Sequence, residues 1–144
     1  MNIGIQLAAC FAASVSFSVL VRQPKGSMLV SGVIATAGYC LFLLMGQSTL
    51  AYFTATLLIG LSCEVSARIM KRAATLFVTG AIIPLVPGVG LYNTMRYVVE
   101  GDYHEAMSTG ASTVLGLCAI ALAITTTSVL FNAFTARGGK KAAP

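Results

Sequence analysis

The sequence predicts an all-α integral membrane protein, and three observations support this fold class. Of its 144 residues, 57% are hydrophobic and only 9% are charged, whereas an average soluble domain carries about 25% charged residues. The mean hydropathy is +0.87. Five apolar stretches are long enough to cross a bilayer, which takes about 20 residues. A soluble enzyme, a disordered tail and a disulfide-stapled secreted domain are therefore excluded.

Short polar or basic segments separate the apolar stretches from one another. The stretches run over about 3–21, 27–45, 49–70, 74–98 and 107–134. Because backbone hydrogen bonds must close within each segment in lipid, we expect all of them to be transmembrane helices. Residues 1–136 then form a single transmembrane domain, and 137–144 form a short basic cytoplasmic tail.

The distribution of charge predicts the orientation of these helices. With the N-terminus outside, the cytoplasmic side receives eight of the nine Lys and Arg residues, and three of the four acids lie on the outer side with Arg96. The predicted topology is therefore N-out and C-in. A re-entrant fourth segment is the alternative, and it would place the basic tail outside.

Small residues recur at helical spacing within the apolar stretches. Gly32 precedes Thr36, Gly60 precedes Glu64 and Ala67, and Ser112 precedes Gly116. Small side chains at this spacing let membrane helices approach closely. We therefore expect these positions to lie at helix–helix contacts.

The fourth stretch contains the most informative motif, Pro84-Leu-Val-Pro87-Gly88-Val-Gly90. Two prolines three residues apart remove two backbone donors, and the glycines loosen the chain further. The motif predicts a broken helix, with one half over about 74–85 and the other over about 88–98. Each half is about 17 Å long, which places the break near the middle of the membrane. A simple proline kink that improves packing is the alternative.

A break of this kind offers free backbone groups to a ligand. The second half-helix begins with unpaired N–H groups at the positive end of its dipole, which favours an anion. Discontinuous helices mark binding sites in transporters. The candidate substrate-binding residues are the motif itself and the polar side chains after it: Pro84, Pro87, Gly88, Gly90, Tyr92, Asn93 and Arg96.

Glu64 in the third stretch is the second candidate, with Arg68 four residues later. Charges at membrane depth are costly and usually face protein or water. At this spacing the two side chains can form an ion pair that only marks the membrane boundary. Alternatively, Glu64 accepts protons beside a substrate path.

No other pattern indicates catalysis or a cofactor. The four cysteines lie in separate apolar stretches without a C-x-x-C pair, and His104 lies in a loop with Glu100, Asp102 and Glu105 that is expected to be solvated. No nucleophile–base set or phosphate loop is found, so we predict no enzyme activity, no metal and no cofactor. The net charge is +5, but the basic residues occur in short clusters beside apolar segments, which argues against nucleic acid as a partner.

The motif Pro84-Leu-Val-Pro-Gly-Val-Gly-Leu-Tyr-Asn-Thr-Met, followed by Gly101-Asp-Tyr and a final helix rich in small residues, resembles the threonine/serine exporter (ThrE) family. The likeness is to the small five-helix subunit, YjjB-like, and covers nearly the whole chain. The family motif maps onto Pro84, Pro87, Gly88, Gly90 and Tyr92; the resemblance carries over no catalytic residues.

The resemblance implies a subunit of a secondary exporter in the bacterial inner membrane. Its expected substrates are threonine and serine or small dicarboxylates such as succinate, and its expected partner is a larger ThrE-like membrane subunit. The size of the chain also favours a hetero- or homo-oligomer. The alternative function is a structural or assembly subunit that does not itself transport.

Overall fold

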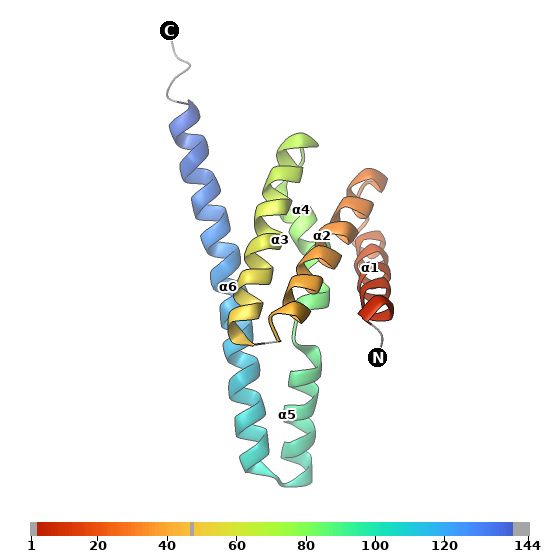
Figure 1. Cartoon of the computed structure of the whole chain (residues 1–144), viewed down its shortest axis with the longest axis vertical. Helices are drawn as coiled ribbons and strands as arrows, with labels where there is room; N and C mark the ends of the chain where they lie inside the picture. The colour runs from red at the N-terminus through yellow and green to blue at the C-terminus, as the bar shows by residue number, and fades with distance from the viewer. Residues whose placement is uncertain (1–2, 47, 140–144) are drawn as a thin grey trace.

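Every regular element in the described part of the chain is helical. The computed structural model describes residues 3–46 and 48–139 (Figure 1). The elements are α1 (Ile3–Leu20), α2 (Lys25–Leu44), α3 (Thr49–Ile69), α4 (Ala74–Ile82), the short 3₁₀ turn η1 (Ile83–Leu85), α5 (Gly88–Glu100) and α6 (Tyr103–Gly139). The prediction of an all-α fold is confirmed, and residues 140–144 of the predicted tail lie outside the described residues.

The helices have the lengths that a membrane requires. Among the described residues, α1, α2, α3 and the apolar part of α6 are each long and apolar enough to span a bilayer. The pair formed by Ala74–Leu85 and Gly88–Glu100 adds a fifth candidate span if it is counted as one crossing, although it is bent by 48°. The orientation relative to the two sides of the membrane remains a prediction from the charges.

Glycines bring α3 into close contact with α6 along much of its length. A Cβ added at Gly60 would lie 2.8 Å from the Thr127 hydroxyl oxygen, and one at Gly116 would lie 3.3 Å from the Tyr52 ring. Gly32 of α2 similarly faces Phe11 and Val15 of α1. The small residues at positions 32, 60 and 116 therefore lie at helix contacts, as the spacing predicts.

The buried core consists mainly of small side chains. Ala51, Ala55 and Ala123 are fully buried, and Phe77 and Ile59 are the largest side chains that are also inaccessible. Most of the long aliphatic side chains point outward instead. This distribution suits a bilayer, because lipid tails solvate aliphatic side chains and helices associate through close packing.

The break between α4 and α5 follows from its two prolines. Pro84 has no N–H to donate to the carbonyl of Gly80, and the Ser14 hydroxyl donates to that carbonyl instead, at 2.7 Å. The Ile83 carbonyl, which Pro87 would serve in a continuous helix, accepts from the Val86 N–H at 3.2 Å. The backbone is extended at Val86, so the helix direction changes there.

Helix α5 turns back sharply into α6. Gly101 has a left-handed backbone (φ +81°), and the Asp102 N–H donates to the Tyr97 carbonyl at 2.9 Å, which closes the end of α5. Asp102 then caps α6, because its carboxylate accepts from the Glu105 N–H at 3.4 Å. The last helix therefore begins at Tyr103, four residues before the predicted start, since Asp102 and Glu105 have the spacing of a capping box.

The α5–α6 hairpin extends past one end of the bundle. In Figure 1, α5 and the first part of α6 project beyond the connection between α2 and α3, and the break lies beside that connection. Within the bundle the break lies level with one end of α2 and α3, and its predicted depth midway across the membrane stays a prediction. This position follows from the 37 residues of α6: its start contacts α5 at Gly90 and Thr94, and α3 packs on α6 from Gly116 onward.

The two ends of the bundle differ in charge. The α1–α2 and α3–α4 connections lie together at the end opposite the break (Figure 1); they carry Arg22, Lys71 and Arg72, and Lys25 begins α2 beside them. We call this end the basic end, and the end with the α2–α3 connection the break end. The predicted topology places the basic end in the cytoplasm.

We expect Gly60→Val to weaken the packing of α3 on α6. The new side chain would overlap Thr127, which is buried, so the free energy of unfolding should fall by about 1–3 kcal/mol. Unfolding in detergent micelles, followed by circular dichroism, measures the change. Gly4→Val is the matched control, because nothing lies within 4 Å of a Cβ at Gly4. Equal stability of the two variants would contradict the assigned contact.

Candidate functional site

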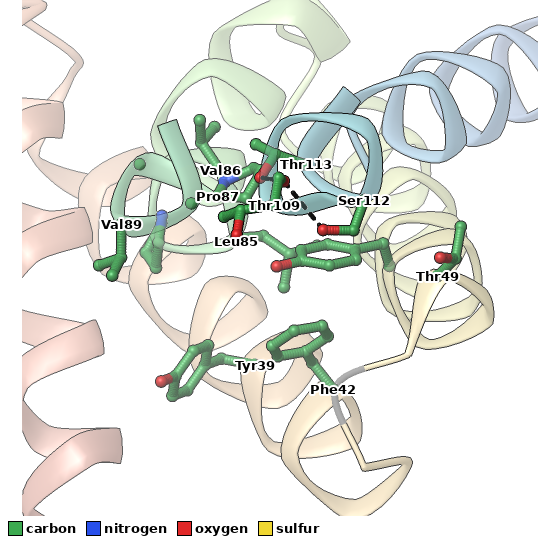
Figure 2. A pocket seen from close by; sticks show the side chains of 14 residues that line it. Tyr39, Phe42, Thr49, Leu85, Val86, Pro87, Val89, Thr109, Ser112 and Thr113 are labelled. Atoms are coloured by element: carbon green, nitrogen blue, oxygen red, sulfur yellow. Dashed lines mark hydrogen bonds between the residues drawn. The ribbon is translucent and has the colours of Figure 1, made fainter. Parts of the chain in front are cut away.

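A cavity of about 380 Å³ lies at the break between α4 and α5 (Figure 2). Its volume is within the range of small-molecule sites. Four parts of the chain that are distant in sequence meet around it, namely the end of α2, the start of α3, the break and the first half of α6. The lining residues are Tyr39, Phe42, Thr49, Tyr52, Pro84, Leu85, Val86, Pro87, Gly88, Val89, Gly90, Thr109, Ser112 and Thr113.

The N-terminus of α5 supplies free backbone donors to this cavity. The N–H groups of Val89 and Gly90 precede the first bond within the helix, and no acceptor for either is found among the described residues. The N-cap residue is Pro87, which provides no side-chain acceptor. These donors and the positive end of the helix dipole favour an anion.

The other half of the break supplies backbone acceptors. The carbonyls of Pro84 and Leu85 lie where the helix has ended, and no donor to them is found in the described part of the chain. Carbonyl oxygens of this kind suit an ammonium group or a cation. The break therefore presents donors and acceptors to one cavity.

Hydroxyl groups from α6 face the cavity from the opposite wall. Ser112 and Thr113 both donate to the Thr109 carbonyl, at 2.9 and 2.7 Å, as the dashed line at Ser112 shows in Figure 2. Their oxygen lone pairs are left as acceptors. Because Asp, Glu, Lys and Arg are absent from the lining residues, the site is polar without a fixed side-chain charge.

Aromatic rings form a further wall. The ring centroids of Phe42 and Tyr52 are 4.5 Å apart, and those of Tyr39 and Phe42 are 6.2 Å apart. Figure 2 shows Tyr39 and Phe42 on the side of the cavity away from the α6 hydroxyls. These rings limit the width of the site and add an apolar surface to it.

Glycine at position 90 allows α5 to approach α6 beside the cavity. A Cβ at Gly90 would overlap the Thr113 hydroxyl, and a Cβ at Gly110 would lie 3.1 Å from Thr94 Cγ2. The Thr94 hydroxyl donates to the Gly90 carbonyl at 2.8 Å. Gly88, in contrast, borders open space, because nothing lies within 4 Å of a Cβ there.

The structure separates the predicted binding residues into two groups. Pro84, Pro87, Gly88 and Gly90 line the cavity, whereas Tyr92, Asn93 and Arg96 lie farther along α5 and do not. Tyr92 is 68% exposed, and Asn93 is partly buried. Arg96 is paired with Glu100 at 3.2 Å, and its guanidinium lies 5.2 Å from the centroid of the Tyr97 ring.

Glu64 and Arg68 lie toward the basic end, remote from this cavity. Tyr52 of α3 lines the cavity, and Glu64 follows twelve residues later on the same helix, or about 18 Å along its axis. The guanidinium of Arg68 lies 4.6 Å from the centroid of the Phe131 ring on α6. A role of Glu64 in proton coupling stays a prediction.

Several lining residues were not candidates in the sequence. Tyr39 and Tyr52 lie near the ends of apolar stretches, where tyrosine typically anchors a helix at the membrane interface. Ser112 precedes Gly116 by four residues, a spacing that predicts a helix contact. One available signal is that Tyr39 and Tyr52 flank the predicted connection between the second and third stretches. Nothing in the sequence indicates that Thr109, Ser112 and Thr113 would lie opposite the break.

A bundle of membrane-length helices indicates a multi-pass membrane protein, and a helix interrupted beside a polar cavity is a feature found in transporters. Residues 6–130 match the family described as "Threonine/Serine exporter, ThrE". The chain therefore belongs to the threonine/serine exporter family, as its motif predicts. No curated protein and no solved structure shows a significant match to it.

We expect Gly90→Val to destabilise the hairpin. The valine would overlap Thr113, so the free energy of unfolding should fall by about 1–3 kcal/mol. Gly88→Val is the matched control at the same helix end, and it should change stability by less than about 0.5 kcal/mol because it meets open space. Thermal unfolding in detergent distinguishes the two. A larger loss at Gly88 than at Gly90 would contradict the geometry of the hairpin.

Proposed function

We propose that this chain is one subunit of a secondary exporter of threonine and serine or of small carboxylates such as succinate. Membership of the exporter family supports the reaction class. The observation that supports the site is the cavity at the α4–α5 break, into which a helix N-terminus and freed carbonyls converge. The chain acts in a multi-pass complex of the bacterial inner membrane.

The cavity suits the carboxylate that all of these substrates share. In the proposed binding mode, the substrate carboxylate accepts from the N–H groups of Val89 and Gly90. The ammonium group of an amino acid donates to the freed carbonyls or to the hydroxyl oxygens of Ser112 and Thr113. For a dicarboxylate, the Ser112 or Thr113 hydroxyl would release the Thr109 carbonyl and donate to the second carboxylate instead. The absence of a charged lining residue favours a small zwitterion or a weakly held anion that can be released.

Tyr92, Asn93 and Arg96 are proposed to act at the approach to the cavity. Arg96 lies eight residues after Gly88, or about 12 Å along α5, and is half exposed. A positive charge at that distance raises the local concentration of anions, although Glu100 offsets part of it. Asn93 and Tyr92 would orient the substrate as it passes between Arg96 and the helix N-terminus.

The proposed partner is a larger ThrE-like membrane subunit. Helix α5 has no fully buried residue, and it exposes Val89, Met95 and Val99 by 75%, 69% and 87%. The hairpin that carries them projects beyond the bundle, which supports a covered position in a complex. The same observation favours the alternative function, a structural subunit that assembles its partner without handling substrate.

Export measurements with Gly88→Leu and Arg96→Ala separate these functions. Gly88→Leu adds a large side chain at the lining of the cavity, where a Cβ has nothing within 4 Å, so we expect efflux to fall by at least about tenfold, which corresponds to 1.4 kcal/mol. Arg96→Ala should reduce efflux at low substrate concentration by a smaller factor. The assay follows labelled threonine, serine and succinate in cells that express the chain with and without its partner.

The control for these measurements is Gly4→Leu. It adds the same side chain to α1, where a Cβ has nothing within 4 Å and the residue does not line the cavity. Correct insertion and assembly are verified by copurification of the two subunits. If Gly88→Leu and Arg96→Ala both leave efflux unchanged in assembled complexes, the proposed site is wrong. Unchanged efflux in both variants would favour the structural role.

Replacing Glu64 with glutamine tests its proposed proton coupling. If Glu64 carries the coupling proton, Glu64→Gln should remove the dependence of efflux on the pH gradient and leave assembly intact. The matched control is Glu105→Gln, because Glu105 is exposed beside the hairpin turn. Efflux that responds to the gradient equally in both variants would contradict a coupling role for Glu64.

A further inference from the structure

A row of buried polar side chains fills the seam where α1, α2 and α4 meet, between the cavity and the basic end. We call it the serine seam. None of its members is more than 3% exposed: they are Ser14, Ser18, Gln23, Ser27 and Ser31. The serines recur every four residues on α1 and on α2, so they form one stripe on each helix. Burying polar groups between apolar helices costs free energy unless they are hydrogen-bonded.

Helix α4 closes this seam through Gly80. A Cβ at Gly80 would overlap the Ser18 hydroxyl and would lie 3.0 Å from Gln23 Nε2. Two hydrogen bonds hold α4 in this position: the Ser14 hydroxyl donates to the Gly80 carbonyl at 2.7 Å, and Gln23 Nε2 donates to the Leu76 carbonyl. The polar groups of α1 and of the α1–α2 connection therefore fix α4 directly.

The hydroxyls of Ser18 and Ser27 are buried without a partner in the described part of the chain. Serine and threonine in a helix can satisfy themselves by donating to the carbonyl four residues earlier. Thr36, Thr94 and Thr127 do so here, each at 2.8 Å. Ser18 and Ser27 do not, so both hydroxyls are uncommitted, and Ser18 points at the contact with α4. A buried unpartnered hydroxyl is explained if another state of the protein supplies water or a ligand.

The seam lies between a smaller cavity beside the main one and the basic end. A smaller cavity of about 250 Å³, lined partly by Cys10 and Ala13 of α1, shares Tyr39 and Pro84 with the main cavity. Cys10 precedes Ser14 by one turn on the buried face of α1. Beyond Ser18 the seam reaches the connection that carries Arg22 and Lys25, where an anion would be attracted first.

We propose that the serine seam is the basic-end half of the substrate path and that α4 closes it in this structure. This inference rests on the proposed export function and adds to it the route and the gate. In the open state α4 leaves the seam, Ser14 and Gln23 release its carbonyls, and the hydroxyls and the amide bind the carboxylate of a small substrate. The extended residue Val86 and the positive φ of Lys71 (51°) end the helical backbone on each side of α4, so α4 is a short segment that is not continuous with its neighbours.

Cysteine accessibility in the complete complex tests the proposal. The four native cysteines are replaced by alanine, and Ser18→Cys or Ser27→Cys is introduced. A charged, membrane-impermeant methanethiosulfonate reagent is added from the basic-end side of sealed vesicles, with and without threonine, serine or succinate. A gate that is open at most about 10% of the time at rest and mostly open during export predicts labelling at least about tenfold faster with substrate.

Matched variants separate a path from general loosening. Ser16→Cys lies on α1 between two seam residues but on its exposed face, so its labelling should not change with substrate. Lys25→Cys should be labelled at all times. Gly80→Ala adds the Cβ that the seam has no room for, so it should speed the labelling of Ser27→Cys at rest by about tenfold.

The outcomes distinguish this inference from the proposed function. If efflux is measured in the same vesicles and positions 18 and 27 stay protected, the inference is overturned while the export function stands. Protection of Ser27→Cys in a folded Gly80→Ala variant also overturns it. If none of the three substrates is exported but Gly80→Ala opens position 27 and not position 16, the gate is supported and the proposed substrates are wrong.

Discussion

The two missing backbone donors at Pro84 and Pro87 determine the arrangement of this bundle. In a membrane every backbone polar group needs a partner, so a helix that loses two donors must obtain replacements or end. The chain does both: Ser14 of another helix serves the Gly80 carbonyl, and the helix ends at Leu85 and restarts at Gly88. The cavity forms where the two helix ends meet, and its free N–H and carbonyl groups follow directly from the interruption.

Two glycines let both halves of the interrupted helix pack closely against the rest of the bundle. Gly80 lets α4 lie against the polar side chains of α1 and α2, and Gly90 lets α5 lie against α6. A larger residue at either position would separate the half-helix from the helices that position it. The two halves therefore have different surroundings: α4 is held by buried hydroxyl and amide groups, and α5 is held mainly by α6.

Local sequence signals predicted the elements well where one interaction dominates. The break was predictable because proline removes a donor in any context, and the glycine contacts at 32, 60 and 116 were predictable because small residues recur at helical spacing. The sequence underestimates the length of α6 because Asp102 and Glu105 read as loop acids, whereas Asp102 caps the helix and Glu105 lies in its first turn. The level of the break within the bundle could not be predicted without the register of α6 against α3. That register is seen where Thr127 meets Gly60.

The amino-acid sequence by itself determined the membrane class, the approximate helices, the family and the residues at which the fourth helix breaks, because each depends on composition, on a local motif or on near neighbours in the chain. The tertiary structure alone decided which side chains share the cavity. Tyr39, Thr49 and Ser112 are brought to the break by the pairing of distant helices, and Arg96 is directed to Glu100 instead. The burial of Ser18 and Gln23 against Gly80 was likewise decided by helix packing, since a serine in an apolar stretch can face lipid, protein or substrate with the same local sequence.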